Sequence, residues 1–483
     1  MHMNKLEKTA FDQIGCAHNA ASMASGQKKC SNKASGGESC AFDGAYIVLN
    51  PIRDTAHLVH GGITCGAHNY ESRGAYSSGS RLYKYCFTTD LSETDIVFGA
   101  EEKLRQAIFE IRKRFSPSAI FVYQTCIPAM TGEDTEQVCL NLAKEIDIPV
   151  IPVIAPGFMG HKNLGNRLAG EALMKYVIGT GQIDEAAKET AALSVNIIGE
   201  YNIAGDIWNI LPLYEKINIP VMAKITGDAD YAEVTRAHHA GLNLMVCSRA
   251  LINVASGMQE KYGIDFIEVS YFGVNNTSYA LKEVLKYFHK HQKIGDQVFS
   301  GSMGIVNRME TEAWENLAPY KKILKGKKAV VYSGGVKSWS MITALTDLGI
   351  EVTAVGTKKS SESDKEKIEQ LIGKDRMLDD TTPKSLLDTI RNTGADFLIA
   401  GSRNQYLAYK EKIPYIDINQ ERHTSYQGYA GAVNLARDLC LTLQSPVWQA
   451  VTNPAPWDLS PSTGETITNQ TDAIQYGANK ETP

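Results

Sequence analysis

The sequence has neither a long uncharged apolar run nor an excess of basic residues. No such run reaches the roughly 18–20 residues needed to cross a bilayer, and residues 1–29 lack the apolar core of a secretory signal peptide. The formal net charge is −5 and the pI is near 6.2, which leaves no electrostatic footprint for nucleic acid. These absences predict a cytoplasmic protein that has neither a membrane nor a nucleic acid as partner.

Familiar motif spacings are also missing. The nine cysteines include no CxxC pair, which argues against a zinc ribbon. The glycines form neither the GxxxxGK[ST] phosphate loop nor the GxGxxG dinucleotide fingerprint. In a reducing cytoplasm cysteines do not pair as disulfides. Each cysteine is therefore a buried apolar side chain, a catalytic group or a metal ligand.

The chain is long, its composition is average for a folded protein, and its apolar and amphipathic stretches alternate. At 483 residues, with 43% hydrophobic and 21% charged residues, the chain predicts two to four folded domains. From residue 45 onward, apolar stretches of strand length alternate with amphipathic helical stretches, which indicates parallel sheets with crossover helices. The clearest expected strands are 119–123, 148–154, 195–198, 220–223, 242–246, 328–332, 351–355, 396–400 and 414–417.

The fold class predicted from this pattern is α/β, with three doubly wound (Rossmann-like) parallel-sheet domains. Residues 282–328 are charged and helical in pattern, and their glycines at 295, 301 and 304 suggest a connection before the pattern restarts. Ligand sites of such sheets lie beyond the carboxyl ends of the strands. The expected division is a mobile N-terminal arm (1–38), three domains (39–190, 191–325 and 326–445) and a C-terminal tail (446–483).

Three cysteines share one local setting. Cys40, Cys65 and Cys126 each stand in a turn punctuated by Gly or Pro, and we expect all three outside helices and strands. Such turns leave a sulfur free to face a ligand. A cubane cluster takes four thiolates, so a set of three predicts that a second chain supplies the fourth. A single cysteine is more often a small buried apolar residue, an interpretation that fits Cys86, Cys139 and Cys440. Cys16 and Cys30, in the arm, receive no assignment.

A fourth cysteine and three basic residues are further candidates. Cys247 follows an expected strand and precedes a helix start beside Arg249, a setting that lowers a thiol pKa. A strand-end cysteine packed in the core fits the same pattern. Lys337 opens a helix after two glycines, where a bulky anion is favoured. Arg73 and Arg403 stand in comparable turns, although each alone is typical of a solvated or salt-bridged surface residue.

At this point the motifs resemble the nitrogenase component 1 superfamily, and within it the branch that matures the iron–molybdenum cofactor. The resemblance runs from about Cys40 to Asp458. Its landmarks include Cys40-Ala-Phe-Asp-Gly44, Lys162-Asn-Leu-Gly-Asn-Arg167, Gly199-Glu-Tyr-Asn-Ile-Ala-Gly205, Asp417-Ile-Asn-Gln-Glu-Arg422 and Pro454-Ala-Pro-Trp-Asp458.

The resemblance implies two metal clusters and several partners. Cys40, Cys65 and Cys126 would bind a 4Fe–4S cluster at the interface with a homologous N-type subunit, in an α2β2 heterotetramer. Cys247 would anchor a large iron–sulfur–carbide cluster, the precursor of the iron–molybdenum cofactor. An upstream radical enzyme would supply this cluster, the nitrogenase iron protein would deliver molybdenum and homocitrate, and an apo nitrogenase would accept the product.

The resemblance also assigns the surroundings of the large cluster. Asn419 stands where catalytic nitrogenase subunits carry a histidine ligand. An amide is a poor ligand for iron compared with imidazole, so a cluster held mainly by one thiolate is able to leave. His423, four positions on, is an alternative ligand. The other positions that match the lining of the pocket are Arg73, Lys162, Asn166, Lys337 and Arg403.

Departures from the family pattern keep a second function open. Gly62 stands where the family usually has Pro, and residues 67–70 depart from its usual pattern beside Cys65. The first function is a maturation scaffold, to which no catalytic residue is assigned. The alternative is the large subunit of a nitrogenase-like reductase of the methylthio-alkane reductase type, which would be an oxidoreductase.

Overall fold

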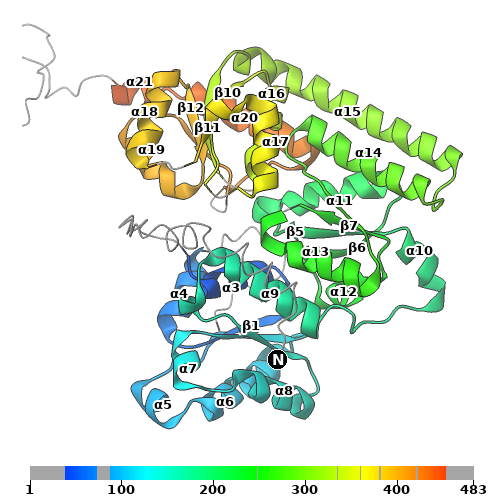
Figure 1. Ribbon diagram of the computed structural model, residues 1–483, viewed down its shortest axis with the longest axis vertical. Helices are drawn as coiled ribbons and strands as arrows, with labels where there is room; N and C mark the ends of the chain where they lie inside the picture. The colour runs from blue at the N-terminus through cyan, green and yellow to red at the C-terminus, as the bar shows by residue number, and fades with distance from the viewer. Residues whose placement is uncertain are drawn as a thin grey trace, which may run out of the picture.

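The computed structural model describes residues 39–72, 87–246, 248–333, 336–358, 360–379, 382–419 and 422–452. The predicted arm (1–38) and most of the predicted tail lie outside this part of the chain, as do Arg73, Cys86 and Cys247. The described residues form three α/β units that follow one another from the blue end of the chain to the orange end (Figure 1). Within them no helix is long and apolar enough to cross a membrane.

The first unit is built on a four-stranded parallel sheet of order β2-β1-β3-β4. Its third strand, Ile-Phe-Val-Tyr-Gln, is buried along its whole length, as expected for a strand that is covered on both faces. The strands are β1 (Ala56–His60), β2 (Phe87–Thr88), β3 (Ile120–Gln124) and β4 (Val150–Ile154), and the helices are α3 (Ala41–Leu49), α4 (Ile63–Ser72), α5 (Glu93–Phe98), α6 (Glu101–Phe115), α7 (Cys126–Thr131), α8 (Thr135–Ile146) and α9 (Lys162–Tyr176).

The second unit repeats this plan with the strand order β6-β5-β7-β8, again all parallel. Its strands are β5 (Val195–Glu200), β6 (Val221–Thr226), β7 (Leu242–Met245) and β8 (Phe266–Glu268), and its helices are α10 (Lys188–Ala192), α11 (Asp206–Lys216), α12 (Tyr231–Arg236) and α13 (Ser248–Tyr262). Two long helices, α14 (Val274–Lys290) and α15 (Asp296–Leu324), then lead to the third unit.

The third unit has a five-stranded parallel sheet of order β11-β10-β9-β12-β13. Its strands are β9 (Lys328–Tyr332), β10 (Glu351–Gly356), β11 (Met377–Leu378), β12 (Phe397–Ala400) and β13 (Tyr415–Asp417), and its helices are α16 (Val336–Asp347), α17 (Glu362–Ile372), α18 (Pro383–Thr393), α19 (Gln405–Lys410), α20 (Gly428–Leu443) and α21 (Val447–Thr452). Across all three units, the described residues also form short 3-10 helices: η2 (Gly157–Met159), η3 (Glu185–Ala187), η4 (Ile203–Gly205), η5 (Ala237–His239), η6 (Lys374–Arg376) and η7 (Ser402–Asn404).

Continuous apolar cores join neighbouring units. Leu49 of α3, Leu173 of α9 and Val254 of α13 belong to one buried cluster that spans the first and second sheets. A second cluster runs from the second sheet through α14, α15 and α20 into the third. Because side chains of neighbouring units pack together in these shared cores, the cores set how the three sheets and their strand ends lie relative to one another.

These features confirm the predicted fold class of three doubly wound parallel sheets. The sheets span 56–154, 195–268 and 328–417, each inside one predicted domain, and the domain boundaries themselves remain a prediction. The expectation of a connection at Gly301 and Gly304 is wrong, because both lie inside α15, whereas Gly295 immediately precedes that helix. Helix α21 occupies the start of the predicted tail.

Candidate functional site

Three cysteines meet at the carboxyl edge of the first sheet. Cys65 lies in the first turn of α4, soon after β1, and Cys126 opens α7 directly after β3. These neighbouring strands are the point at which the strand order reverses, where open parallel sheets place their ligands. Cys40 is the N-cap residue of α3 and pairs with His161 through an isolated β-bridge. The fold therefore brings together residues that are up to 86 positions apart in the sequence.

Gly157 shows how closely the sulfurs converge. It lies in η2, shortly after β4, and a methyl group added at its α-carbon would lie 3.2 Å from the sulfurs of both Cys40 and Cys126. Cys65 is close enough that the thiols of the other two cysteines add to the shift of its pKa. Any side chain at Gly157 would compete for the space between the thiols.

The cysteines differ from the expectation in one respect. Cys65 and Cys126 lie in the first turns of helices, so the prediction that all three stand outside regular elements is wrong for these two. A helix N-terminus favours a thiolate. Burial, followed by the neighbouring thiols, raises the pKa of Cys65 above its ordinary value. Metal binding at Cys65 would therefore release a proton. Cys139 and Cys440 are buried in the core, which confirms their interpretation as packing residues.

The donor set fits a polynuclear cluster better than a single ion. In the described part of the chain, no three His, Cys, Asp or Glu side chains close on one metal ion. Cys40, Cys65 and Cys126 instead surround a common space beside Gly157. An iron–sulfur cubane takes one thiolate at each iron, so its ligands do not need to approach a single point. Three converging thiols are therefore compatible with a 4Fe–4S cluster that has one ligand from elsewhere.

Exposed apolar side chains lie on the elements that carry two of these cysteines or Gly157, and on α5, which contacts α7. Phe98 of α5 is 84% exposed and Met130 of α7 is 77% exposed, far more than large apolar residues usually are. Contiguous exposed apolar patches typically mark interaction sites. The group comes from α4, α5, α7 and η2, three of which also carry Cys65, Cys126 or Gly157, and we call it the apolar rim: Ile63, Val97, Phe98, Met130, Phe158 and Met159.

A second group of predicted residues gathers at the carboxyl edge of the third sheet. Lys337 of α16 follows β9, Arg403 of η7 follows β12, and Asn419 follows β13. The strand order reverses between β9 and β12. The Lys337 Nζ donates to Asn419 Oδ1 and to the Ile418 carbonyl, both at 3.4 Å. The sheet therefore places all three residues at one edge, as its topology predicts, and a hydrogen bond joins Lys337 to Asn419.

Ser39 connects this edge to the first unit. An Arg403 guanidinium nitrogen donates to the Ser39 hydroxyl at 3.5 Å, and the Lys162 amide donates to the Ser39 carbonyl at 2.9 Å. Asn166, one turn along α9, is buried, and its Oδ1 accepts no hydrogen bond from the described residues. Such an atom costs about 1–3 kcal/mol unless something pairs with it. His423 is exposed.

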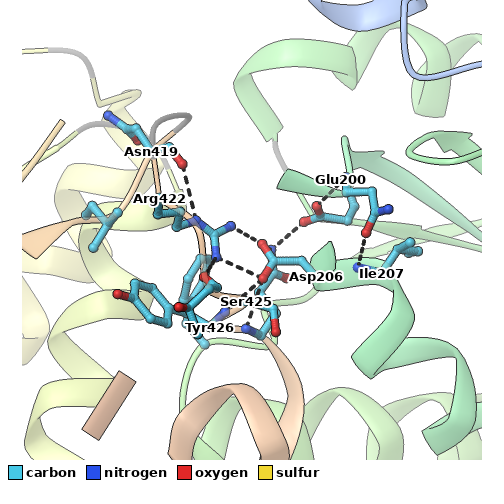
Figure 2. A network of polar contacts seen from close by, with 12 residues as sticks. Glu200, Asp206, Ile207, Asn419, Arg422, Ser425 and Tyr426 are labelled. Carbon is cyan, nitrogen blue, oxygen red and sulfur yellow. Dashed lines mark hydrogen bonds and ion pairs between the residues drawn. The ribbon is translucent and has the colours of Figure 1, made fainter. Parts of the chain in front are cut away.

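A buried polar network beside Asn419 was missed at the sequence level. Figure 2 shows Arg422 between Asn419 and Asp206, with Glu200 beyond. Arg422 and Asp206 form a bidentate ion pair between side chains that are 2% and 0% exposed. Burial, then the Asp206 charge, raises the pKa of Glu200 to about 7. Glu200 and Arg422 lie within segments that carry the family resemblance and Asp206 directly follows one, but no local pattern reveals that the segments meet.

The chain belongs to the family of nitrogenase component 1 type oxidoreductases, whose model matches residues 40–444. It is 50% identical to the nitrogenase iron-molybdenum cofactor biosynthesis protein NifE of Rippkaea orientalis, over 95% of this chain and 96% of that protein. It is 42% identical to the NifE protein of Klebsiella pneumoniae, over 92% of this chain and 98% of that protein. The solved structure of nitrogenase Cp1 at pH 6.5 covers 87% of this chain and 91% of its own, with 27% identity and a TM-score of 0.78. Membership of this family implies iron–sulfur cluster binding.

Proposed function

We propose that this chain is a subunit of the scaffold on which the iron–molybdenum cofactor of nitrogenase is assembled. The observation that carries the proposal is the near full-length identity to curated cofactor-biosynthesis proteins, 50% in one case, combined with three thiols that converge at a strand-order reversal. The alternative, a reductase of the methylthio-alkane type, is disfavoured because both of the curated relatives described above are named as biosynthesis proteins.

The three converging thiols are the proposed ligands of a 4Fe–4S cluster. Cys40, Cys65 and Cys126 would each hold one iron, and a homologous N-type subunit would supply the fourth thiolate in an α2β2 heterotetramer. The apolar rim supports this assembly, because a partner that covers it would also exclude water from the cluster. When bound, such a cluster supplies reversible one-electron transfer.

The edge of the third sheet is the proposed cargo site, and the large iron–sulfur–carbide cluster is the cargo. Cys247, which lies outside the described residues, would be its one strong ligand. Lys337 and Arg403 supply positive charge, and the buried Asn166 offers an unpaired oxygen. Lys162 and Arg73 complete the proposed set. Asn419 is a weak ligand by its chemistry, which suits a site that must release what it holds.

Three further partners complete the proposed cycle. A radical enzyme upstream would supply the large cluster, and the nitrogenase iron protein would bring molybdenum and homocitrate. The matured cluster would then pass to an apo nitrogenase. This direction of transfer fits a chain that has one strong cargo ligand, because a single bond must break at release.

The test is cluster transfer from the purified heterotetramer to apo nitrogenase, followed by recovered nitrogenase activity. We expect Cys247→Ala to abolish loading and transfer while the interface cluster stays, and Asn419→His to slow release because an imidazole–iron bond must then break. Cys440→Ala, at a buried cysteine of α20, is the matched control and should transfer normally. Unchanged transfer in Cys247→Ala contradicts the cargo-site assignment, and thioether reduction by the wild-type complex would favour the reductase.

A further inference from the structure

A buried ion pair joins the second unit to the segment that carries Asn419. Arg422 follows β13 in the third unit, and Asp206 opens α11 in the second. One guanidinium nitrogen of Arg422 donates to Asp206 Oδ1 at 2.9 Å and the other donates to Oδ2. The two side chains are almost fully buried, and 216 positions of sequence separate them.

The same guanidinium also fixes the backbone of its own segment. The Arg422 Nε donates to the Asn419 carbonyl at 3.2 Å, and a terminal nitrogen donates to the Thr424 carbonyl at 3.3 Å. Asp206 in turn accepts from the backbone amides of Tyr426 at 2.9 Å and Gln427 at 3.3 Å. Figure 2 shows the pair at the centre of these contacts. One charged pair therefore holds the segment on both sides of Arg422.

Further polar side chains surround the ion pair, and its role is geometric. Gln427 Nε2 donates to both Asp206, at 3.0 Å, and Glu200. Lys337 donates to the Asn419 side chain. A buried ion pair adds little net stability compared with a well-packed apolar pair. The pair instead fixes an orientation, because the planar guanidinium donates hydrogen bonds to one carboxylate and two backbone carbonyls in a single arrangement. Arg422 is too deeply buried to touch the cargo itself.

We propose that Arg422 is a positioning residue of the cargo site, which holds Asn419 in the orientation that retains the large cluster. The inference rests on the proposed function, because it concerns retention at that site. Through the Asn419 carbonyl, the pair with Asp206 sets where the Asn419 side chain lies relative to Lys337. Loosening the pair should shorten retention and leave the thiol site at the first sheet unaffected.

The test uses the double variant Asp206→Asn/Arg422→Gln in the purified heterotetramer. This change removes both charges together, so that neither is left buried alone, and it keeps polar groups at both positions. We expect the half-time of cluster transfer to apo nitrogenase to shorten about tenfold, the usual scale for loss of an outer hydrogen-bond partner of a metal site. The iron content and electron paramagnetic resonance signal of the interface cluster should not change.

A second ion pair between units provides a matched control. Arg53 and Asp230 form a bidentate pair that joins the first unit to the second, with hydrogen bonds of 2.9 and 2.8 Å. The variant Arg53→Gln/Asp230→Asn should lower the melting temperature without altering release. If the Asp206/Arg422 double variant fails to fold, Arg422→Lys provides the second measurement. It retains the charge but loses the planar fork, and it should also release the cluster faster than wild type.

Hydrogen exchange separates positioning from mere stability. The Asn419 amide donates to Asp417 Oδ1 at 2.7 Å, and in the Arg422 variants we expect this amide to exchange faster while the core strand β12 stays protected. Retention at the wild-type rate in the folded variants contradicts the inference and leaves the proposed function intact. A wild-type complex that never retains a large cluster contradicts both.

Discussion

Gly157 illustrates how a single absent side chain shapes the thiol site. An added β-carbon would lie 3.2 Å from two sulfurs at once, which is closer than such contacts normally are, and helix N-termini hold both cysteines in place. We expect Gly157→Ala to fold but to bind less iron, because the methyl group occupies space between the ligands. Iron per αβ pair and the melting temperature of the metal-free protein are the measurements.

Gly62→Ala is the control for this substitution. Gly62 stands just before the helix that carries Cys65, yet a β-carbon there would meet only the Thr64 hydroxyl oxygen, at 3.9 Å. Full iron content is expected in this variant. Wild-type iron content in Gly157→Ala would mean that the sulfurs do not need the space beside Gly157.

The raised pKa of Glu200 predicts a pH-dependent stability. Its folded-state pKa of about 7 exceeds the ordinary value of 4.5 because of burial first and the Asp206 charge second. The folded protein therefore binds this proton more tightly than the unfolded chain does. The contribution of Glu200 to the free energy of unfolding is fully present below pH 4.5, falls as the pH rises to about 7, and is constant above that.

Glu200→Gln should remove this dependence. A neutral amide has no proton to lose, so the difference in free energy of unfolding between variant and wild type should grow from pH 4.5 to 7 in favour of the variant. Denaturant titrations at several pH values measure it. The pKa of Glu233 is also raised to about 7. Because Glu233 is present in both proteins, its contribution to the free energy of unfolding cancels in the difference between them. Parallel pH profiles for the two proteins would show that Glu200 stays ionised in the fold.

At this scale the sequence revealed the thiols but not the ion pair. Cys40, Cys65 and Cys126 were identified because each stands within a few residues of a turn signal of Gly or Pro, and such signals are readable locally. Asp206 and Arg422 carry no local signal, since an acidic residue at a helix start and an arginine in a loop are typical of exposed positions. Their pairing depends on contacts 216 positions apart.

At the scale of elements, the approach of α3 to α9 positions the thiol site. A β-carbon at Gly165 would overlap the Ala41 carbonyl oxygen, and one at Gly44 would overlap that of Lys162. The helices therefore touch through their backbones, and α3 carries Cys40 at its N-terminus. Such close contact is available only where glycines face each other.

Gly165→Ala should consequently destabilise the protein, although alanine ordinarily favours a helix. Alanine in a free helical position gains up to about 1 kcal/mol over glycine, whereas overpacking costs about 1–3 kcal/mol. We expect a net loss of stability together with loss of the interface cluster. Denaturant unfolding and iron content measure the two effects. Gly304→Ala in α15 is the control, because its β-carbon would meet only Arg308, at 3.7 Å, and a gain of stability in both variants would exclude backbone contact.

The structure confirms all nine predicted strands. Most of them are largely apolar runs, such as β3 and β9, because burial on both faces leaves a nearly continuous hydrophobic signal. Strand β1 was missed because two of its five residues are histidines. Both are buried and paired: His57 Nδ1 lies 2.8 Å from the Tyr123 hydroxyl, and His60 Nε2 lies 2.8 Å from Glu133 Oε2. Because the tertiary fold gives both histidines a hydrogen-bond partner, a strand with a partly polar sequence is able to lie in the core.

Across the whole molecule, the carboxyl edges of the first and third sheets are linked through Ser39. This residue precedes Cys40 and accepts from Arg403, so the proposed interface cluster and the proposed cargo site share one connecting residue. The thiol site is also bordered by the apolar rim, which comes from elements of the first unit alone. The rim therefore belongs to a surface that the other two units of this chain do not cover.

The apolar rim predicts where the homologous partner binds. Phe98 and Phe158 are 84% and 60% exposed, so replacing both with Glu should change the folding stability of this chain by only about 0.5 kcal/mol. Burying those two carboxylates under a partner would instead cost several kcal/mol. We expect Phe98→Glu/Phe158→Glu to abolish co-purification of the partner and to remove the proposed interface cluster, because the proposed fourth ligand comes from that partner. Tyr406→Glu, at an 82% exposed residue of α19, is the control and should leave the heterotetramer intact. Mass photometry and iron analysis measure both properties, and an intact heterotetramer in the Phe98/Phe158 variant would place the partner on another face.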